Sequence, residues 1–185
     1  MIDESDIDGA CLVLASSNPG KIKEFRDLIT CFPFQLIPQP ENFYVEENGN
    51  TFAENARLKA LAASNYTGQW ALADDSGLSV KALSGAPGVY SARYADNDQE
   101  RIRRLLKEME SFEERTASFH CALCMVKPNN EIFLEVEGIC EGLITNSPRG
   151  ENGFGYDPIF EVLGTGLTFA EMEIQQKQAL SHRAL

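Results

Sequence analysis

The stretch ALADDSGLSV, Ala71–Val80, sets two adjacent carboxylates inside an apolar run that otherwise indicates a buried β-strand. Ionised carboxylates in an apolar interior are costly unless a positive group meets them. Asp74 and Asp75 therefore need either a buried basic partner or helix N-terminus, or else a metal ion or a catalytic task. The residues alone leave both alternatives open, because structural ion pairs shift the pKa values of carboxylates just as active sites do.

Strand and helix patterns follow one another on both sides of this stretch. Runs of apolar residues predict strands at 11–15, 70–80, 117–126 and 131–139, the last two joined as a hairpin around KPNN. Helical spacing and capping residues predict helices at 19–29, 51–64, 99–110 and 169–180, with a proline-rich link after the first. This mixture of crossovers and hairpins predicts an α/β fold with a mixed sheet.

Length and composition bound the class of protein. The 185 residues fit a single domain, expected at 10–185 after an acidic leader at 1–9, and the 43% hydrophobic and 24% charged content is that of a soluble folded protein. The net charge of -12 argues against a nucleic-acid coat or an anionic-membrane binder. No apolar run approaches about 18 residues and no secretory signal is present, so we expect a cytoplasmic protein.

The five cysteines are expected to be core residues. Cys121 and Cys124 form a CxxC, but residues three apart on the predicted strand point to opposite faces. They cannot share a metal ion without breaking that strand. Five is also an odd number, in a chain large enough to need no disulfide.

The turn SSNPGK, Ser16–Lys21, is a candidate phosphate site. Asn18 is placed as a helix N-cap with Pro19 at the first helical position, at an end where backbone N–H groups are available. Lys21 in the first turn opposes the helix dipole, so its position makes sense where an anion lies over that terminus. An ordinary capped helix is the alternative, and the turn lacks residues that a Walker A loop requires.

Three further segments carry candidate groups, each with a plainer alternative. Glu47 and Glu54 precede Lys59, yet acidic residues near a helix start are commonly solvated partners of the dipole. The glycine loop NGFGYDPIF, residues 152–160, presents an aromatic side chain that would either stack on a base or plug the loop from beneath. The segment SHR, Ser181–Arg183, gathers hydrogen-bond donors, and an exposed polar tail is its alternative.

Taken in order, these segments resemble the inosine triphosphate pyrophosphatase family. The resemblance runs from about Cys11 to Leu185 and is carried by SSNPGK, TFAENA, ADDSGL, GAPGVYSARYA, FHCALC, GFGYDPIF and SHR. It implies hydrolysis of inosine, deoxyinosine and xanthosine triphosphates to a monophosphate and pyrophosphate with Mg²⁺. It also implies an elongated mixed β-sheet flanked by helices, two lobes with a nucleotide cleft between them, and a homodimer. Relatives usually continue past SHR into a closing helix, whereas this sequence ends two residues after Arg183.

The resemblance further implies a role for each matching position. Glu47 and Asp75 would bind the metal, and Asp75 would also accept the proton of the attacking water. Because adjacent side chains on a strand project to opposite faces, Asp74 is expected to be a supporting group. The substrate contacts would come from Ser16, Ser17, Asn18, Pro19, Gly20, Lys21, Lys59, Ser76, Phe154, Gly155, Tyr156, Asp157, Lys177, His182 and Arg183.

Two rival functions would keep the same fold. One is a nucleotide-binding sensor without turnover, although a pure binder has no use for a water-activating carboxylate beside metal ligands. The other is a triphosphate pyrophosphatase with a different base preference, such as one for modified pyrimidine nucleotides. In every case the expected partner is a nucleoside triphosphate, and neither a nucleic acid polymer nor a membrane.

Overall fold

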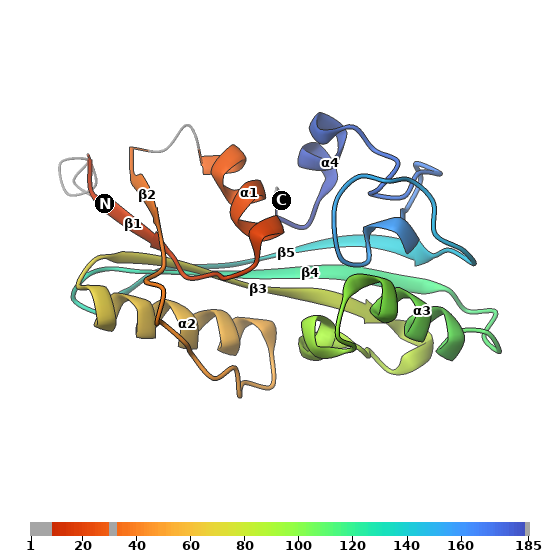
Figure 1. Ribbon diagram of the computed structural model, residues 1–185, viewed down its shortest axis with the longest axis horizontal. Coiled ribbons are helices and arrows are strands. Elements are labelled where there is room, and N and C mark those ends of the chain that lie inside the picture. Colours follow the sequence, from red (N-terminus) through yellow and green to blue (C-terminus); the bar gives the residue numbers. More distant parts are fainter. Residues whose placement is uncertain (1–8, 30–32, 184–185) are drawn as a thin grey trace. The chain divides into compact units, whose positions relative to one another are not determined.

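The computed structural model describes residues 9–29 and 33–183. Its helices are α1 (Pro19–Leu28), α2 (Phe52–Thr67), α3 (Asp98–Glu108) and α4 (Ile174–Leu180). Its strands are β1 (Cys11–Leu14), β2 (Gln35–Pro38), β3 (Trp70–Val80), β4 (Thr116–Val126), β5 (Ile132–Ile144) and β6 (Phe160–Val162), hydrogen-bonded in the order β2-β1-β3-β4-β5-β6. β1 pairs in parallel with β2 and β3, whereas β5 and β6 are antiparallel (Figure 1). The sheet is therefore mixed, and the predicted α/β class is confirmed.

The chain divides into two compact units. The first unit comprises residues 1–75 and 122–137, and the second comprises residues 76–121 and 138–185. The division cuts through β3, β4 and β5, so each unit holds its own part of these strands. Apart from Gly9, the predicted acidic leader lies outside the described residues.

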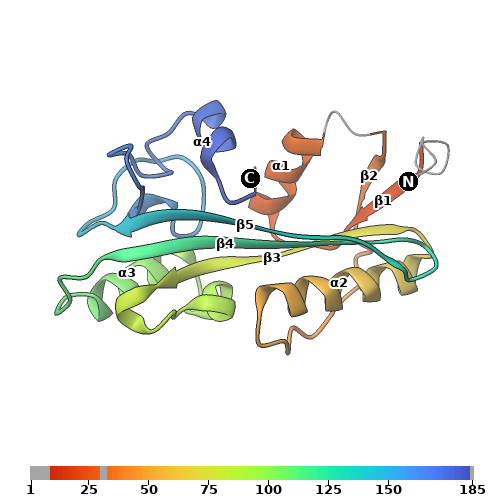
Figure 2. The same ribbon diagram turned by 180° about the vertical axis from the view of Figure 1, so that it is seen from behind.

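In the first unit, α1 and α2 lie on opposite faces of the strands (Figures 1 and 2). The α1 face is a cluster of large side chains, among them Leu12, Phe25 and Trp70. The α2 face is built from small ones, and the buried alanines of α2 let the helix approach the sheet closely. Both faces of β1 and the start of β3 are thus covered, which explains their continuous apolar sequences.

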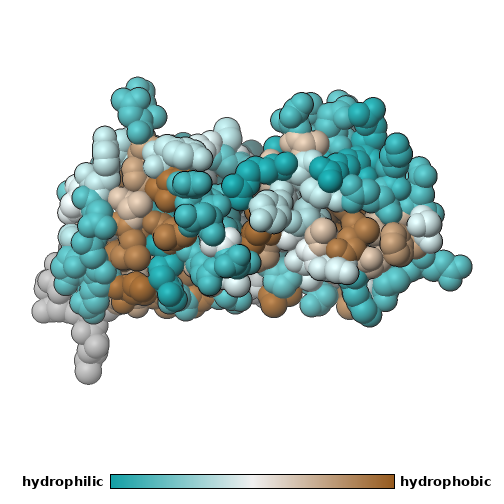
Figure 3. Space-filling view, turned by 90° about the horizontal axis from the view of Figure 1, so that it is seen from below, coloured by the Kyte–Doolittle hydropathy of each residue, from teal (hydrophilic) through white to brown (hydrophobic). Residues whose placement is uncertain are grey.

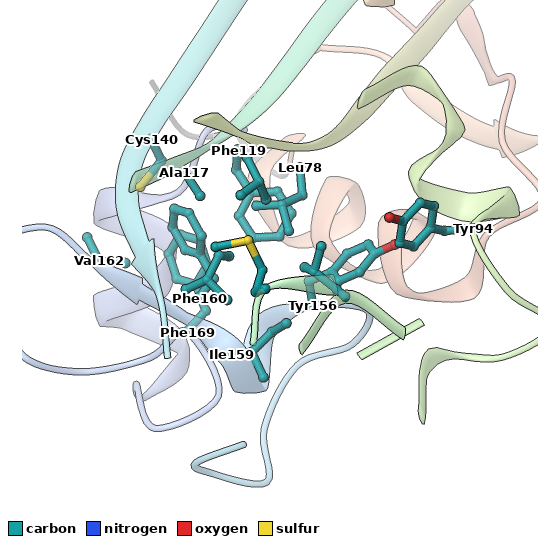
Figure 4. Close-up of a cluster of buried hydrophobic side chains, with 14 of the residues drawn as sticks. Leu78, Tyr94, Ala117, Phe119, Cys140, Tyr156, Ile159, Phe160, Val162 and Phe169 are labelled. Carbon is teal, nitrogen blue, oxygen red and sulfur yellow. The ribbon is translucent and has the colours of Figure 1, made fainter. Parts of the chain in front are cut away.

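In the second unit, α3 and α4 lie on opposite faces of the strands, and aromatic rings fill much of the core (Figures 1 and 4). The ring centroid of Phe160 lies 4.6 Å from that of Phe119 and 5.4 Å from that of Phe169. Leu105 and Met109, from α3 and its C-terminal end, join the same cluster. This core supports the glycine loop that precedes β6.

Two short strands, β2 and β6, were not predicted. β6 has only three residues. β2 has four, as β1 has, but its sequence QLIP begins with a polar residue and ends with a proline, so no continuous apolar run marks it. β2 is defined by its partner, since Gln35 lies opposite Cys11 in the parallel ladder with β1. The predicted strand at 131–139 is also longer in the structure, because β5 continues to Ile144 and pairs with β6.

The helix predicted at 169–180 is wrong in its first half, because α4 begins at Ile174. The backbone of the preceding residues is used by other segments. Phe169 N–H donates to the Phe160 carbonyl at 3.1 Å, and the Ala170 carbonyl accepts from Asn152 N–H at 3.0 Å. These long-range hydrogen bonds replace the helical ones, so the amphipathic spacing of 169–173 reflects packing of a turn rather than a helix.

The prediction that the cysteines are core residues is confirmed for Cys121, Cys124 and Cys140, which are buried. Cys11 is only half-buried, and Cys31 lies outside the described residues. Burial raises the pKa of the Cys124 thiol to about 12, and the nearby charge of Glu135 adds to this. Such thiols behave as small apolar groups.

The surface is mostly hydrophilic on the face seen in Figure 3, with apolar side chains in small groups. Some exposed apolar surface is ordinary for a folded protein. Among the helices of the described residues, none is both long enough and apolar enough to cross a membrane.

Candidate active site

The turn between β1 and α1 forms a capped helix start. Asn18 Oδ1 accepts hydrogen bonds from the backbone N–H groups of Gly20 and Lys21, at 2.9 and 3.2 Å. Pro19 occupies the first helical position, and Ser16 Oγ accepts from the Asn18 N–H at 3.3 Å. The cap uses two N–H groups of the helix start, which favours the capped-helix alternative. Phosphate binding by residues 16–21 stays a prediction.

The side chain of Lys21 reaches from α1 to β3. Its Nζ lies 3.0 Å from Asp74 Oδ2, and the Asp74 side chain is fully buried. A buried carboxylate tolerates its ionised form when such a partner is present. Asp74 therefore has the buried basic partner that was one of the two alternatives, and it anchors the ammonium group of Lys21.

Asp75 has different surroundings. Its Oδ1 lies 3.3 Å from Lys59 Nζ, and the same ammonium lies 2.7 Å from Glu47 Oε1. Burial raises the pKa of Asp75 in spite of the opposing attraction of Lys59. Burial on its own would lower the pKa of Lys59, but the negative charges of Asp75 and its acidic neighbours outweigh it and raise that pKa. Lys59 thus joins the two carboxylates that were predicted to bind the metal.

Asn55 belongs to the same cluster, although it was not predicted from the sequence. Its Nδ2 donates to Asp75 Oδ2 at 3.0 Å. Asn55 and Lys59 lie one turn apart on α2, and this four-residue spacing on a predicted helix is a signal that could have found it. We call this set the carboxylate–lysine cluster: Lys21, Glu47, Asn55, Lys59, Asp74 and Asp75.

Glu47 and Asp75 offer the oxygen ligands that Mg²⁺ prefers. This ion keeps several waters and is usually bound through one or two carboxylates together with substrate phosphates. Within residues 9–29 and 33–183, no group of three or more His, Cys, Asp or Glu side chains is arranged to hold a metal ion. Metal binding by Glu47 and Asp75 stays a prediction; two carboxylates are the number of protein ligands that an Mg²⁺ ion usually takes when substrate phosphates complete its coordination.

In the second unit, Asp157 organises the loop that carries Phe154. Its buried Oδ2 accepts from the Phe154 N–H at 2.9 Å and lies 2.7 Å from Lys177 Nζ. Gly153 has a φ of +78°, and a Cβ there would come within 2.0 Å of Asp157 Oδ2. Only glycine fits this position. The motif NGFGYD thus encodes a tight turn closed by its own aspartate.

Two cationic side chains face the half-buried ring of Phe154. Lys177 Nζ lies 5.1 Å from the ring centroid, and the guanidinium carbon of Arg183 lies 5.6 Å from it. Both distances are within the range of cation–π attraction. Arg183 Nη2 also donates to Ser76 Oγ at 2.7 Å. We call this set the aromatic–lysine cluster: Ser76, Phe154, Asp157, Lys177 and Arg183.

Tyr156 and His182 lie in the core of the second unit. The Tyr156 ring is buried, and its hydroxyl donates to the Ser91 carbonyl at 3.0 Å. His182 is only 3% exposed and stacks on Phe119, with ring centroids 4.8 Å apart and 8° between the planes. In this structure both side chains thus pack within the core of the second unit, and their contacts with substrate stay predictions.

The predicted site residues fall into separate sets, one in each unit. Ser16–Lys21, Glu47, Lys59, Asp74 and Asp75 lie in the first unit; Ser76, Phe154–Asp157, Lys177, His182 and Arg183 lie in the second. Gly155 is tied to the start of α3, because its N–H donates to Asp98 Oδ2 at 2.8 Å. Asp98 and Asn55 are thus two contributors that were not predicted from the sequence.

The lysines and carboxylates of one unit suit phosphates and a divalent cation, and the glycine–aromatic loop of the other suits a base, so the two sets together indicate an enzyme that acts on nucleotides. The family model described as the Ham1 family matches residues 12–185. The chain belongs to the Ham1 family, and the predicted resemblance is confirmed.

Individual relatives are similar over nearly the whole chain. A dITP/XTP pyrophosphatase of Prochlorococcus marinus strain MIT 9313 is 63% identical over 172 residues, which cover 93% of this chain and 85% of the relative. The structure of a HAM1 protein from Coxiella burnetii matches with a TM-score of 0.86 and 46% identity, covering 94% of this chain and 92% of the other. The crystal structure of a nucleoside-triphosphatase / dITP/XTP pyrophosphatase from Mycobacterium abscessus matches with a TM-score of 0.76 and 39% identity, covering 94% and 95%.

Proposed function

We propose that this chain hydrolyses non-standard purine nucleoside triphosphates, among them ITP, dITP and XTP, to the monophosphate and pyrophosphate. The observation that carries the proposal is the contact of Lys59 with both Glu47 and Asp75, because phosphoryl transfer needs cations and a water-orienting carboxylate together. Relatives named dITP/XTP pyrophosphatase, similar over nearly the whole chain, support the substrate class. The proposal includes a cytoplasmic location, where the enzyme would clear these nucleotides from the pool.

The carboxylate–lysine cluster would act on the triphosphate. Glu47 and Asp75 would hold Mg²⁺, which when bound supplies positive charge to the phosphoryl oxygens. Lys21 and Lys59 would bind phosphate oxygens. Asp75 would orient a water molecule toward the α-phosphorus and accept its proton, a role that suits a carboxylate whose pKa burial has raised. Attack at the α-phosphorus releases pyrophosphate in one step.

The aromatic–lysine cluster would recognise the base. The half-buried ring of Phe154 offers a surface for stacking, and Arg183 beside it offers N–H donors. Together with His182, these donors suit the 6-oxo group of hypoxanthine or xanthine and leave a 6-amino group unmatched. A buried donor without an acceptor costs about 1–3 kcal/mol, so selectivity against ATP should reach about tenfold to a hundredfold per contact.

A panel of nucleoside triphosphates, assayed with Mg²⁺ and scored separately for monophosphate and pyrophosphate, tests the activity. We expect equal amounts of the two products and a kcat/KM for ITP, dITP and XTP well above that for ATP. Equal kcat/KM for ITP and ATP would contradict the base assignment. Tight binding of ITP without turnover would favour a nucleotide-binding sensor. Preference for a modified pyrimidine nucleotide would favour a triphosphate pyrophosphatase with a different base preference.

Hydrolysis in ¹⁸O-labelled water tests the site of attack. Water that attacks the α-phosphorus leaves its oxygen in the monophosphate. We therefore expect the label in the monophosphate by mass spectrometry. Label in the pyrophosphate would place the attack on the β-phosphorus and remove Asp75 from the role proposed for it.

We also propose that the enzyme is a homodimer. In the first unit, Ile132, Leu134 and Val136 alternate along β5 and are 39, 44 and 43% exposed. Packing against a second copy would remove this apolar stripe from water. Light scattering on a sizing column should give twice the chain mass, and Leu134→Glu should lower it toward that of one chain. A wild-type mass of one chain would contradict the proposal.

A further inference from the structure

We propose that Asn55 is a positioning residue. It sets the orientation of the Asp75 carboxylate, and it holds the segment that carries Glu47 against the same amide. The inference rests on the proposed function, in which Glu47 and Asp75 bind Mg²⁺. It adds to that function a side chain that acts through both of these carboxylate-bearing segments.

Asn55 is fully buried, and both ends of its amide are used. Its Nδ2 donates to Asp75 Oδ2 at 3.0 Å, and its Oδ1 accepts from the Gly49 N–H at 2.8 Å. A backbone N–H can only donate and an ionised carboxylate can only accept, so the amide satisfies both partners. An aspartate of almost the same size would satisfy Gly49 alone, and a leucine would satisfy neither.

The Asp75 carboxylate is held at both oxygens by side chains of one helix. Asn55 and Lys59 are four residues apart on α2 and therefore project to the same side. Lys59 Nζ lies 3.3 Å from Oδ1, and Asn55 Nδ2 lies 3.0 Å from Oδ2. Two donors on two oxygens fix the plane of the carboxylate, whereas Lys59 alone would let it rotate.

The segment that carries Glu47 is attached to the same amide. Gly49, two residues after Glu47, makes the hydrogen bond to Asn55 Oδ1. A Cβ at Gly49 would lie 2.7 Å from that oxygen, so the segment approaches α2 as closely as a glycine allows. One buried side chain thus connects the neighbourhood of Glu47 with Asp75.

Groups that hold a metal-ligating side chain usually change metal affinity or activity by about 10- to 100-fold when they are removed. We expect Asn55→Ala to lower the affinity for the metal ion and kcat with ITP by about this factor, because Asp75 gains freedom to rotate. The KM for ITP at saturating Mg²⁺ should change far less, since within the carboxylate–lysine cluster only Lys21 and Lys59 are proposed to contact the phosphates, and Asn55 has no proposed contact with the base.

The test uses the full chain and two readouts. Metal affinity is measured without substrate, with Mn²⁺ as the probe followed by electron paramagnetic resonance, and kcat and KM for ITP are measured at saturating Mg²⁺. Ser64→Ala is the matched control, because Ser64 is also fully buried and polar on α2 but donates to the Lys127 carbonyl at 2.8 Å. It should lower the thermal midpoint and leave both readouts unchanged. An Asn55→Ala enzyme within twofold of wild type in both readouts would overturn the inference, as would equal losses in the two variants.

Asn55→Asp is the second variant, for the case in which Asn55→Ala does not fold. It keeps the size and the acceptor for Gly49 but removes the donor to Asp75, so kcat at saturating Mg²⁺ should fall at least about tenfold. A kcat equal to that of wild type would overturn the inference.

The variants Glu47→Gln and Asp75→Asn distinguish a failure of this inference from a failure of the proposed function. If these two variants keep metal affinity and kcat, the assignment of the site fails. If they lose both while the Asn55 variants do not, only the role of Asn55 fails.

Discussion

The ammonium group of Lys21 lies 3.0 Å from the carboxylate of Asp74, whereas the ammonium of Lys59 lies 3.3 Å from that of Asp75. Each of the two adjacent aspartates in β3 thus has its own lysine, supplied by a different helix. Asp74 is paired in the manner of a structural ion pair. Asp75 shares its lysine with a second carboxylate, Glu47, which is the arrangement expected of a metal and phosphate site.

Replacing Asp74 should act first on stability. Asp74→Asn leaves the ammonium of Lys21 facing a neutral amide in a buried place, which should lower the free energy of unfolding by about 3–5 kcal/mol in urea titrations. Combining it with Lys21→Met should cost less than the sum of the two single changes. The kcat of Asp74→Asn should fall less than that of Asp75→Asn. Additive stability losses would contradict the pairing.

Replacing Asp75 should act on catalysis. Asp75→Asn keeps the shape of the side chain but removes a ligand charge and the proton acceptor, so kcat with ITP should fall by at least about 100-fold in steady-state assays. Mg²⁺ should raise the thermal midpoint of the wild type more than that of the variant. Turnover near the wild-type rate would remove Asp75 from its proposed role.

Without metal, Asp75→Asn should not lower the stability of the folded protein, in contrast to Asp74→Asn. Burial raises the pKa of Asp75 above its value in the unfolded chain, so its protonated form favours folding at low pH. That contribution is lost as pH rises through the folded-state pKa. At pH 7 Asp75→Asn removes a costly buried charge, and its thermal midpoint in EDTA should equal or exceed that of the wild type. The difference should shrink at pH 4, and a lower midpoint at pH 7 would contradict this account.

The two lysines should affect all substrates alike. Lys21→Ala and Lys59→Ala should lower kcat/KM for every triphosphate by a similar factor and leave the ratio of ITP to ATP unchanged, because phosphates are common to all of them. Lys81→Ala is a suitable control, since its side chain is 69% exposed and pairs with Glu114. A changed ratio would show that these lysines contact the base.

Arg183 should affect the base preference. Arg183→Ala removes donors beside the Phe154 ring, so the ratio of kcat/KM for ITP to that for ATP should fall by about tenfold or more. Arg103→Ala, an exposed change on α3 in the same unit, should leave the ratio as it is. Unchanged selectivity in Arg183→Ala would require another origin for base recognition.

Local patterns in the sequence were sufficient for the elements that depend on neighbouring residues. The bounds of β3 and the cap of Asn18 on α1 follow from such patterns. So does the start of α2, where Thr51, the first residue of the predicted helix 51–64, is the N-cap. Asn55 escaped notice because its partner Asp75 is 20 residues away in the chain, and only the packing of α2 on the sheet brings them together. The partner of each aspartate was likewise unpredictable, since both lysines were equally available.

The chain divides between Asp75 and Ser76, neighbours within the single motif ADDSGL. Asp75 belongs to the groups proposed for hydrolysis. Ser76 belongs to the groups proposed for the base, because its hydroxyl accepts a hydrogen bond from Arg183. The groups proposed for the base and those proposed for hydrolysis thus rest on separate hydrophobic cores, which are joined covalently within β3. If these assignments hold, substitutions in the second core would change the accepted base and leave the hydrolytic groups of the first core in place, so that the substrate range could change over evolutionary time while the chemistry stayed the same.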